Sequence, residues 1–287
     1  MVTMNRVKAV AVETIVDIAW MPRYVDATYV DHYQSFRKFW PSMHWTTATV
    51  ERKIVWSPGL FTLTIAAPEV SHFEPGQFLQ LGVTLEDKRI NRPYSVASPH
   101  GASLEFFIVL VENGLLTPHL WKLNPGDKLE VSQKAAGSFT LKHSPEAPTL
   151  WLLATGTGIA PYIAMLRTNE PWRRYERIIF VHGVRHRNDL AYQNELIAYR
   201  DRYGQRFTSV SVVSREDVPG SLRGRITTCI SNGSLENVAN HTLTPQDCVM
   251  MCGNPDMLDE TEKMLEERGL KRHRAKSPGQ IVVERYW

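Results

Sequence analysis

A glycine-rich turn holds the clearest candidate chemistry in this 287-residue sequence. The apolar run Thr149 to Ala154 leads into Thr155-Gly156-Thr157-Gly158-Ile159-Ala160-Pro161, and a helical pattern follows. Glycines at such a strand-to-helix turn let backbone amides approach a pyrophosphate at a helix N-terminus. Because Pro161 replaces the third glycine of the usual dinucleotide pattern, the motif alone is a weak signal, and tight turn geometry is the alternative.

Arginines stand where a dinucleotide fold would contact the adenosine ribose. An NAD-type site has an acid near the end of the second strand, but this sequence has His182-Gly183-Val184-Arg185-His186-Arg187 there. The third strand ends in Ser214-Arg215, and Arg223 and Arg225 follow. Guanidinium groups suit a 2′-phosphate, so the pattern favours NADP(H) over NAD(H). We expect Arg187 and Arg223 only to solvate the surface.

The segment Arg92-Pro93-Tyr94-Ser95 combines a cation, a rigid turn, an aromatic ring and a hydroxyl at a strand edge. On an alternating strand Arg92 and Tyr94 share a face, where the ring would stack on a flavin and the guanidinium would neutralise a diphosphate. Ser95 would reach the reactive edge of the flavin. A bare four-residue pattern of this kind more often marks an ordinary strand edge.

Two further loops carry candidate ligand groups. The loop from Glu112 to Pro118 opens a short helix with Thr117 as a fair N-cap, and its amides suit phosphate. Later, Met251-Cys252-Gly253-Asn254-Pro255 ends a buried strand and opens a helix. Strand ends face the ligand crevice in such sheets, so Cys252 would project toward the reacting centre; a small buried hydrophobe is the alternative.

The secondary-structure elements that must position these groups follow two different sequence patterns. Before about Leu141, turns such as Pro75-Gly76 separate six β-rich runs, which predict a small antiparallel barrel. The runs are Thr49 to Val55, Leu60 to Ile65, Gln77 to Val83, Tyr94 to Ala97, Leu104 to Val111 and Lys128 to Ser132.

After Pro145 the pattern changes to buried strands that alternate with helices, which is typical of a parallel sheet covered on both faces. Strands are expected at Thr149 to Ala154, Arg177 to Val181, Arg206 to Val213, Asp247 to Met251 and Gln280 to Val283. Helices are expected at Ile159 to Arg167, Asp189 to Tyr199 and Pro255 to Arg268.

The composition is that of a globular chain: 43% hydrophobic and 22% charged residues, with a net charge of +3. That balance is too mild to argue for nucleic acid, and no apolar run approaches the roughly 18 residues of a membrane span. Three cysteines without C-x-x-C spacing indicate neither disulfides nor a zinc or iron–sulfur site. We therefore expect no metal and a reducing, cytoplasmic setting.

The sequence resembles the ferredoxin (flavodoxin)–NADP+ reductases of bacteria in six ordered motifs over residues 44 to 287. They are R-P-Y-S, the G-L-L-T loop, A-T-G-T-G-I-A-P-Y, V-S-R-E, C-G-N-P and the terminal V-E-R-Y-W. The resemblance implies an FAD-binding antiparallel barrel at 44–145 and a Rossmann-like NADP-binding α/β domain at 146–287. Residues 1–43 form an extension of unknown role.

The resemblance also implies roles for individual residues. Arg92, Pro93, Tyr94 and Ser95 would hold FAD with Thr117 and the Ala135-Ala136-Gly137 turn, and Lys88 or Arg89 competes with Arg92 for the diphosphate. Thr155, Gly156, Thr157, Gly158, Arg185, Arg215 and Arg225 would bind NADP(H). Ser95, Cys252, Glu284 and Tyr286 would be the catalytic positions, with Tyr286 and Trp287 as a gate over the flavin.

Function follows from the same resemblance: an enzyme that passes electrons between NADPH and ferredoxin or flavodoxin, expected as a monomer. The basic stretch Lys271 to Lys276 could dock an acidic carrier. Two alternatives stay open. One is a related NAD(P)H-dependent flavoprotein reductase that serves another acceptor, and the other is a non-catalytic flavin redox sensor.

Overall fold

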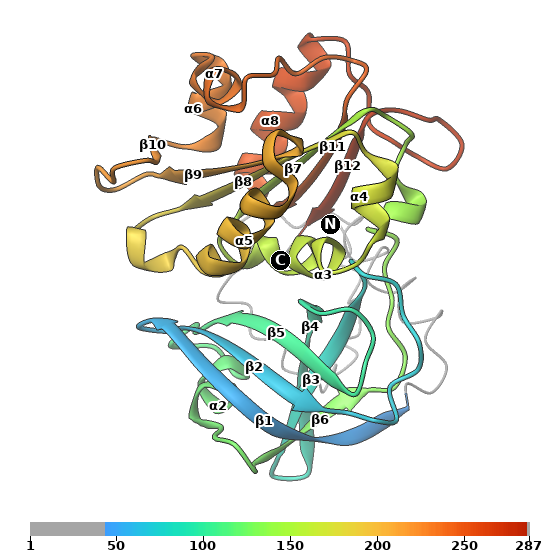
Figure 1. Cartoon of the computed structure of the whole chain (residues 1–287). Helices are drawn as coiled ribbons and strands as arrows, with labels where there is room; N and C mark the ends of the chain where they lie inside the picture. The colour runs from blue at the N-terminus through green and yellow to red at the C-terminus, as the bar shows by residue number, and fades with distance from the viewer. Residues whose placement is uncertain (1–43, 286–287) are drawn as a thin grey trace, which may run out of the picture. The chain divides into compact units, whose positions relative to one another are not determined.

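The computed structural model describes residues 44–285, and Figure 1 shows their strands and helices in chain order. The expected N-terminal extension, residues 1–43, lies outside the described residues, as do Tyr286 and Trp287. Within residues 44–285 no helix is long and apolar enough to cross a membrane.

Six antiparallel strands form the first sheet, in the spatial order β4-β3-β6-β1-β2-β5. They are β1 (Trp45–Ser57), β2 (Leu60–Ala66), β3 (Phe78–Leu85), β4 (Lys88–Ser95), β5 (Ser103–Val109) and β6 (Lys128–Ser132). An antiparallel bridge between Val96 and Phe106 joins the chain just past β4 to β5, and the Ala97 amide donates to the Glu105 carbonyl at 2.7 Å. This bridge closes the sheet on itself, which confirms the predicted antiparallel barrel.

The strand β4 begins earlier than predicted. The expected run from Tyr94 onward is only the end of a strand that starts at Lys88. Glu86 and Asp87 have φ angles of 47° and 62°, which fits a tight two-residue hairpin turn between β3 and β4. Hydrophobic periodicity misses the first half of β4 because most of its residues are polar and exposed or half-buried.

Six parallel strands form the second sheet, in the order β10-β9-β8-β7-β11-β12. They are β7 (Thr149–Thr155), β8 (Arg177–Val184), β9 (Phe207–Val213), β10 (Leu222–Arg223), β11 (Cys248–Gly253) and β12 (Ile281–Arg285). Every residue of β7 before Thr155 is buried, which explains its continuous apolar sequence. The strand order reverses between β7 and β11, so the ligand crevice of this sheet is expected at their carboxyl ends.

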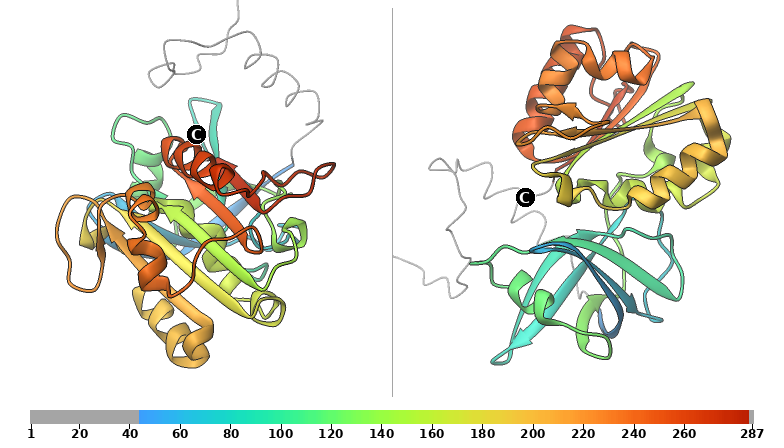
Figure 2. Two further views of the ribbon diagram at one scale, coloured as in Figure 1. Left: turned by 90° about the horizontal axis from the view of Figure 1, so that it is seen from above. Right: turned by 60° about the vertical axis from the view of Figure 1, so that its left-hand side comes forward.

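Helices cover both faces of the parallel sheet (Figure 2). One face carries α3 (Ala160–Leu166), α4 (Glu170–Arg174) and α5 (Gln193–Tyr203), and the other carries α6 (Ile226–Ser231), α7 (Ser234–Ala239) and α8 (Pro255–Glu267). The barrel has α2 (Thr117–Lys122). Single 3-10 turns are η1 (Leu141–His143), η2 (Gly156–Ile159), η3 (Arg187–Asp189) and η4 (Gly204–Arg206). The sequence does not reveal α4, α6 or α7, which are too short for a helical period to show.

Alternate residues of the central strands pack into two hydrophobic clusters. Leu152 faces the α3 side of the sheet, whereas Leu153 faces the α6 side. The cluster on the α3 side continues into the barrel at Leu60, Ala97 and Phe107. Ala97, two residues past β4, therefore shares one hydrophobic cluster with Cys252 at the end of β11.

Two Pro-Gly turns of the barrel differ in how closely other backbone packs against them, and this difference can be tested. Gly76 has φ +103°, and a Cβ there would lie 1.9 Å from the Phe139 carbonyl oxygen. Gly126 has φ +96°, with nothing within 4 Å of such a Cβ. Gly126→Ala should cost about 1–2 kcal/mol for its left-handed backbone, and Gly76→Ala about 1–3 kcal/mol more because backbone must move. Urea unfolding measures both, and equal losses would contradict the predicted contact.

Candidate functional site

The nucleotide loop crosses the end of β11 at a distance that leaves no room for side chains. A Cβ on Gly158 would lie 2.5 Å from the Cys252 carbonyl oxygen, and one on Gly253 would lie 2.3 Å from Thr155 Oγ1. The Asn254 amide donates to Thr155 Oγ1 at 2.8 Å, which fastens the start of α8 to the end of β7. Glycine is therefore required at these two positions to bring the strand ends together.

The first residue of the loop is held by a histidine that the sequence did not single out. Gly156 has φ +54° and open space beside its Cα, as a backbone that must approach a phosphate requires. His182 Nε2 lies 3.0 Å from the Gly156 carbonyl oxygen, so this nitrogen carries the hydrogen and donates. Burial lowers the pKa of His182 to about 4, and its Nδ1 has no hydrogen-bond partner within the part of the chain described.

Four strands place one residue each in a row at the carboxyl edge of the sheet. Sheet register pairs His182 of β8 with Ala154 of β7, Ala154 with Cys252 of β11, and Cys252 with Glu284 of β12. Cys252 is fully buried in the cluster that extends into the barrel. Burial raises the pKa of the Glu284 carboxyl to about 7. The predicted catalytic pair Cys252 and Glu284 thus lies side by side, and no sequence signal pointed to His182.

The predicted adenosine-phosphate arginines gather at the ends of β8 and β9. The Arg215 amide donates to the Arg185 carbonyl at 3.0 Å, and the Gly224 amide returns to the Val213 carbonyl at 3.0 Å just before Arg225. Arg185, Arg215 and Arg225 are exposed and form no ion pair with any residue that the structure describes. By contrast, Arg223 lies 3.7 Å from Asp217. Arg187 is likewise exposed and has no ion pair within residues 44–285, so the lack of an acidic partner agrees with the three predicted phosphate ligands without singling them out.

In the barrel, contacts with neighbouring strands distinguish the two arginines that compete for the diphosphate. Arg89 donates two hydrogen bonds to Glu130 and stacks over the Trp45 ring with its Cζ 4.4 Å from the centroid. Arg92 is exposed, and within residues 44–285 it donates only to the carbonyl of its neighbour Asn91. Of these two cations, Arg92 is the one whose charge is available for a diphosphate.

The remaining predicted flavin residues surround the end of β4. Tyr94 packs on the barrel core, and burial raises the pKa of its hydroxyl. Ser95 is buried and pairs with Phe78 of β3, whose amide and carbonyl both bond Ala136 on the other side. Gly137 follows Ala136 with φ +105°, as this turn requires. The structure therefore brings together Tyr94, Ser95 and the Ala136-Gly137 turn, with Pro93 exposed beside them.

Thr117 occupies a different position in its helix than predicted. The N-cap of α2 is Leu116, and Thr117 is the first helical residue. Its Oγ1 accepts from the Val111 amide at 2.9 Å and donates to the Val111 carbonyl at 3.1 Å. The hydroxyl therefore closes the loop instead of capping the helix, since both of its hydrogen bonds go to the backbone of Val111.

The two halves match two known domain families. Residues 47–140 match the family described as "Oxidoreductase FAD-binding domain", and residues 152–263 match "Oxidoreductase NAD-binding domain". A two-domain flavin-dependent oxidoreductase is thus the class that the fold and the comparisons define.

Individual relatives narrow the class. The chain is 39% identical over 246 residues to the flavodoxin/ferredoxin–NADP reductase of Escherichia coli K12, covering 85% of this chain and 99% of the relative. It is 38% identical over 247 residues to the enzyme of that name from Buchnera aphidicola, with the same coverage. A ferredoxin NADP+ reductase from Neisseria gonorrhoeae, solved with FAD and NADP, superposes with a TM-score of 0.80 at 32% identity, covering 84% of this chain and 98% of that one. The chain belongs to the flavodoxin/ferredoxin–NADP reductase family.

The pKa of Glu284 predicts how stability depends on pH. The folded protein holds this proton up to about pH 7, whereas the ordinary carboxyl value is 4.5. Between these values the folded state binds more protons than the unfolded state, so stability falls as the pH rises through the interval. The free energy of unfolding of the holoenzyme should be measured from acid to neutral pH. In Glu284→Gln its decrease over this range should be smaller than in the parent by about 1–3 kcal/mol. Glu260→Gln, at an exposed position of α8, is the control, and parallel curves for all three proteins would refute the shift.

Proposed function

We propose that this chain passes electrons between NADPH and ferredoxin or flavodoxin, with the site residues in the roles described below. The observation that carries the proposal is the shared hydrophobic cluster. It joins Ala97, just past the flavin-type strand end, to Ala154 and Cys252 at the ends of the nucleotide-binding strands. Two cofactor sites that border one cluster can bring the reacting rings together without exposing them to water.

The barrel residues fit FAD. Tyr94 offers a half-buried ring and Ser95 a hydroxyl at the strand end. Arg92 offers an exposed cation that has no acidic partner among the described residues. Thr117 would contribute indirectly, because its hydroxyl holds the loop that would contact FAD. Gly137 would likewise contribute by shaping the turn beside Phe78. When bound, FAD supplies the exchange between a two-electron donor and one-electron carriers.

The α/β residues fit NADP(H). Gly156 leaves open space at the loop where Thr155, Thr157 and Gly158 supply backbone. Arg185, Arg215 and Arg225 would bind the 2′-phosphate. Ser95, Cys252 and Glu284 would orient the nicotinamide against the flavin, and Glu284, with its raised pKa, would hold a proton near neutral pH. For Tyr286 and Trp287 we retain the role of a gate over the flavin.

The carrier would dock on the basic stretch that follows α8. Lys271, Arg274 and Lys276 are exposed, whereas Arg272 is engaged with Glu262 at 2.7 Å. Three exposed cations on one segment, none of them paired with an acid in the described part of the chain, would steer an acidic protein by long-range attraction. We further propose a cytoplasmic monomer that binds no nucleic acid.

Anaerobic titration of the purified holoenzyme tests the function. NADPH should bleach the flavin, and oxidised ferredoxin or flavodoxin should restore its colour. Bleaching without reoxidation by either carrier would favour a related reductase with another acceptor. A flavin that NADPH does not bleach would favour the redox sensor.

Single substitutions test the coenzyme site. A hydrogen bond to a charged group contributes about 1.5–3 kcal/mol, so Arg215→Ala should lower kcat/KM for NADPH about ten- to a hundredfold. Arg185→Ala and Arg225→Ala should act in the same direction. NADH lacks the phosphate, so its kcat/KM should barely change. Arg223→Ala is the matched control because Asp217 already pairs with that arginine. If all three variants keep the parent NADPH-to-NADH ratio, the phosphate binds elsewhere.

A further inference from the structure

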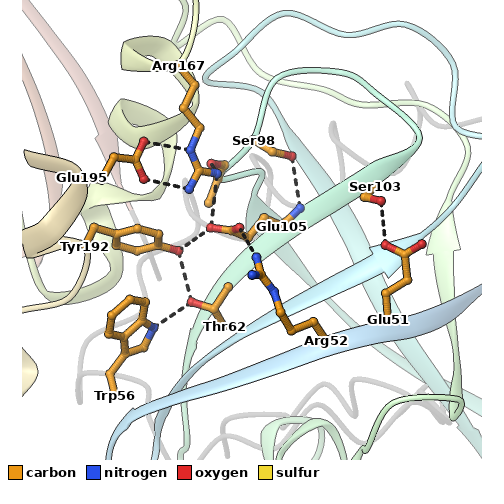
Figure 3. Close-up of polar contacts among 11 residues, drawn as sticks. Glu51, Arg52, Trp56, Thr62, Ser98, Ser103, Glu105, Arg167, Tyr192 and Glu195 are labelled. Atoms are coloured by element: carbon orange, nitrogen blue, oxygen red, sulfur yellow. Dashed lines mark hydrogen bonds and ion pairs between the residues drawn. The ribbon is translucent and has the colours of Figure 1, made fainter. Parts of the chain in front are cut away.

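Directional polar contacts connect the barrel to the α/β half in addition to the apolar cluster. Figure 3 shows Arg167 and Tyr192 of the α/β half pointing toward Glu105 on the barrel strand β5. Glu105 is buried, with its side chain 8% exposed, and its carboxylate lies within 4 Å of a cation from each half, Arg52 of the barrel and Arg167 of the α/β half. None of these residues belongs to the predicted cofactor sites.

Arg167 forms the central connection. It is the C-cap residue of α3, the helix that begins directly after the nucleotide turn η2. Its Nη1 donates to the Ala97 carbonyl at 2.9 Å and lies 3.3 Å from Glu105 Oε1. Its Nε and Nη2 both donate to Glu195 of α5 at 2.9 Å, so the planar guanidinium is fixed in orientation.

Tyr192 makes a second, parallel connection. Its hydroxyl donates to Glu105 Oε1 at 2.8 Å and lies 3.1 Å from Thr62 Oγ1 of β2. Trp56 Nε1 donates to the same Thr62 oxygen at 2.8 Å. Burial and the neighbouring Glu105 carboxylate raise the pKa of Tyr192, so the hydroxyl stays a donor.

Stability alone does not account for a buried charge at this interface. Removing two charges from water costs nearly as much as their attraction returns, and apolar side chains of similar volume often stabilise better. Apolar contacts of the shared cluster resist separation but permit sliding, because dispersion has little directional preference. Bonds of fixed geometry to Ala97 and Glu105 do not permit it.

We propose that Arg167 and Tyr192 are positioning residues that fix the Ser95–Ala97 segment relative to the nucleotide-loop helix. Ala97 lies two residues after Ser95, and α3 begins where the nucleotide turn ends, so one guanidinium connects the two cofactor-binding elements. The residues thereby set the placement of nicotinamide against flavin. This inference rests on the proposed cofactor sites, and it assigns Arg167 and Tyr192 no contact with either ligand.

Arg167→Met in the holoenzyme removes the contacts to Ala97 and Glu105 while it keeps an unbranched stem. The rate of flavin reduction by NADPH, measured by stopped flow, should fall at least about tenfold because the reacting rings are misaligned. The change in flavin absorbance on NADP+ binding, which reports ring stacking, should weaken. Affinity for 2′-phospho-AMP, measured by calorimetry, should stay within about twofold, since the arginines that bind it are untouched.

Arg52→Met is the matched control. Arg52 lies 3.8 Å from Glu105 Oε2 with its side chain 61% exposed, and both residues belong to the barrel. The variant removes an ion pair of Glu105 without touching the connection between the halves, so all three measurements should match the parent. A lower melting temperature with parent reduction rates in Arg167→Met would show a merely structural role and overturn the proposal.

Tyr192→Phe keeps the test decisive if Arg167→Met does not fold. It removes one hydroxyl and retains the ring contacts with Trp56 and Phe107. Flavin reduction should slow about fivefold, the equivalent of one hydrogen bond. A rate within about twofold of the parent would overturn the proposal. If the parent itself is not reduced by NADPH, the proposed function fails instead, and the 2′-phospho-AMP measurement separates that failure from a lost nucleotide site.

Discussion

The close approach of two backbone segments at the reversal of strand order is the constraint on which the α/β site depends. Gly158 and the Cys252 carbonyl, and Gly253 and Thr155, leave no space for a Cβ. Because the segments touch, the loop that would receive a pyrophosphate lies directly beside the strand end that carries Cys252. A side chain at either glycine would push the loop away from the strand end that carries Cys252.

The arginines near the candidate sites differ in whether an acidic side chain already pairs with them. Arg89, Arg223 and Arg272 each have an acidic partner. Arg92, Arg185 and Arg215 have none within residues 44–285, although all three are exposed. An unpaired cation on a surface keeps its attraction for an arriving anion, whereas a paired one must first lose its partner.

Local signals in the sequence were sufficient for the barrel except the first half of β4, because buried strands show as apolar runs and Pro-Gly turns separate them. They were also sufficient for every strand of the parallel sheet but β10. These signals located the turn Gly156–Ile159 directly after β7 and the arginines after the predicted strands, whereas the binding roles of these residues stay predictions. Contacts between residues far apart in the sequence could not be predicted in this way. The choice of Arg92 over Arg89 depends on Glu130 in β6, and His182 is defined by the Gly156 carbonyl 26 positions earlier. The two-residue strand β10 and the short helices α6 and α7 offered no period to detect.

Glu105 illustrates why the interface between the two halves was equally invisible. In a strand pattern it is one polar residue among apolar neighbours, and its partners Arg167 and Tyr192 come from a later domain. The contacts among these three residues become visible only in the structure. They show that the apolar cluster and the polar contacts have different effects on the interface. The cluster makes association favourable over a range of relative placements, and the hydrogen bonds select one of them. Because a reacting pair tolerates little displacement, an interface between two cofactor domains needs the second property even where the first already provides the affinity.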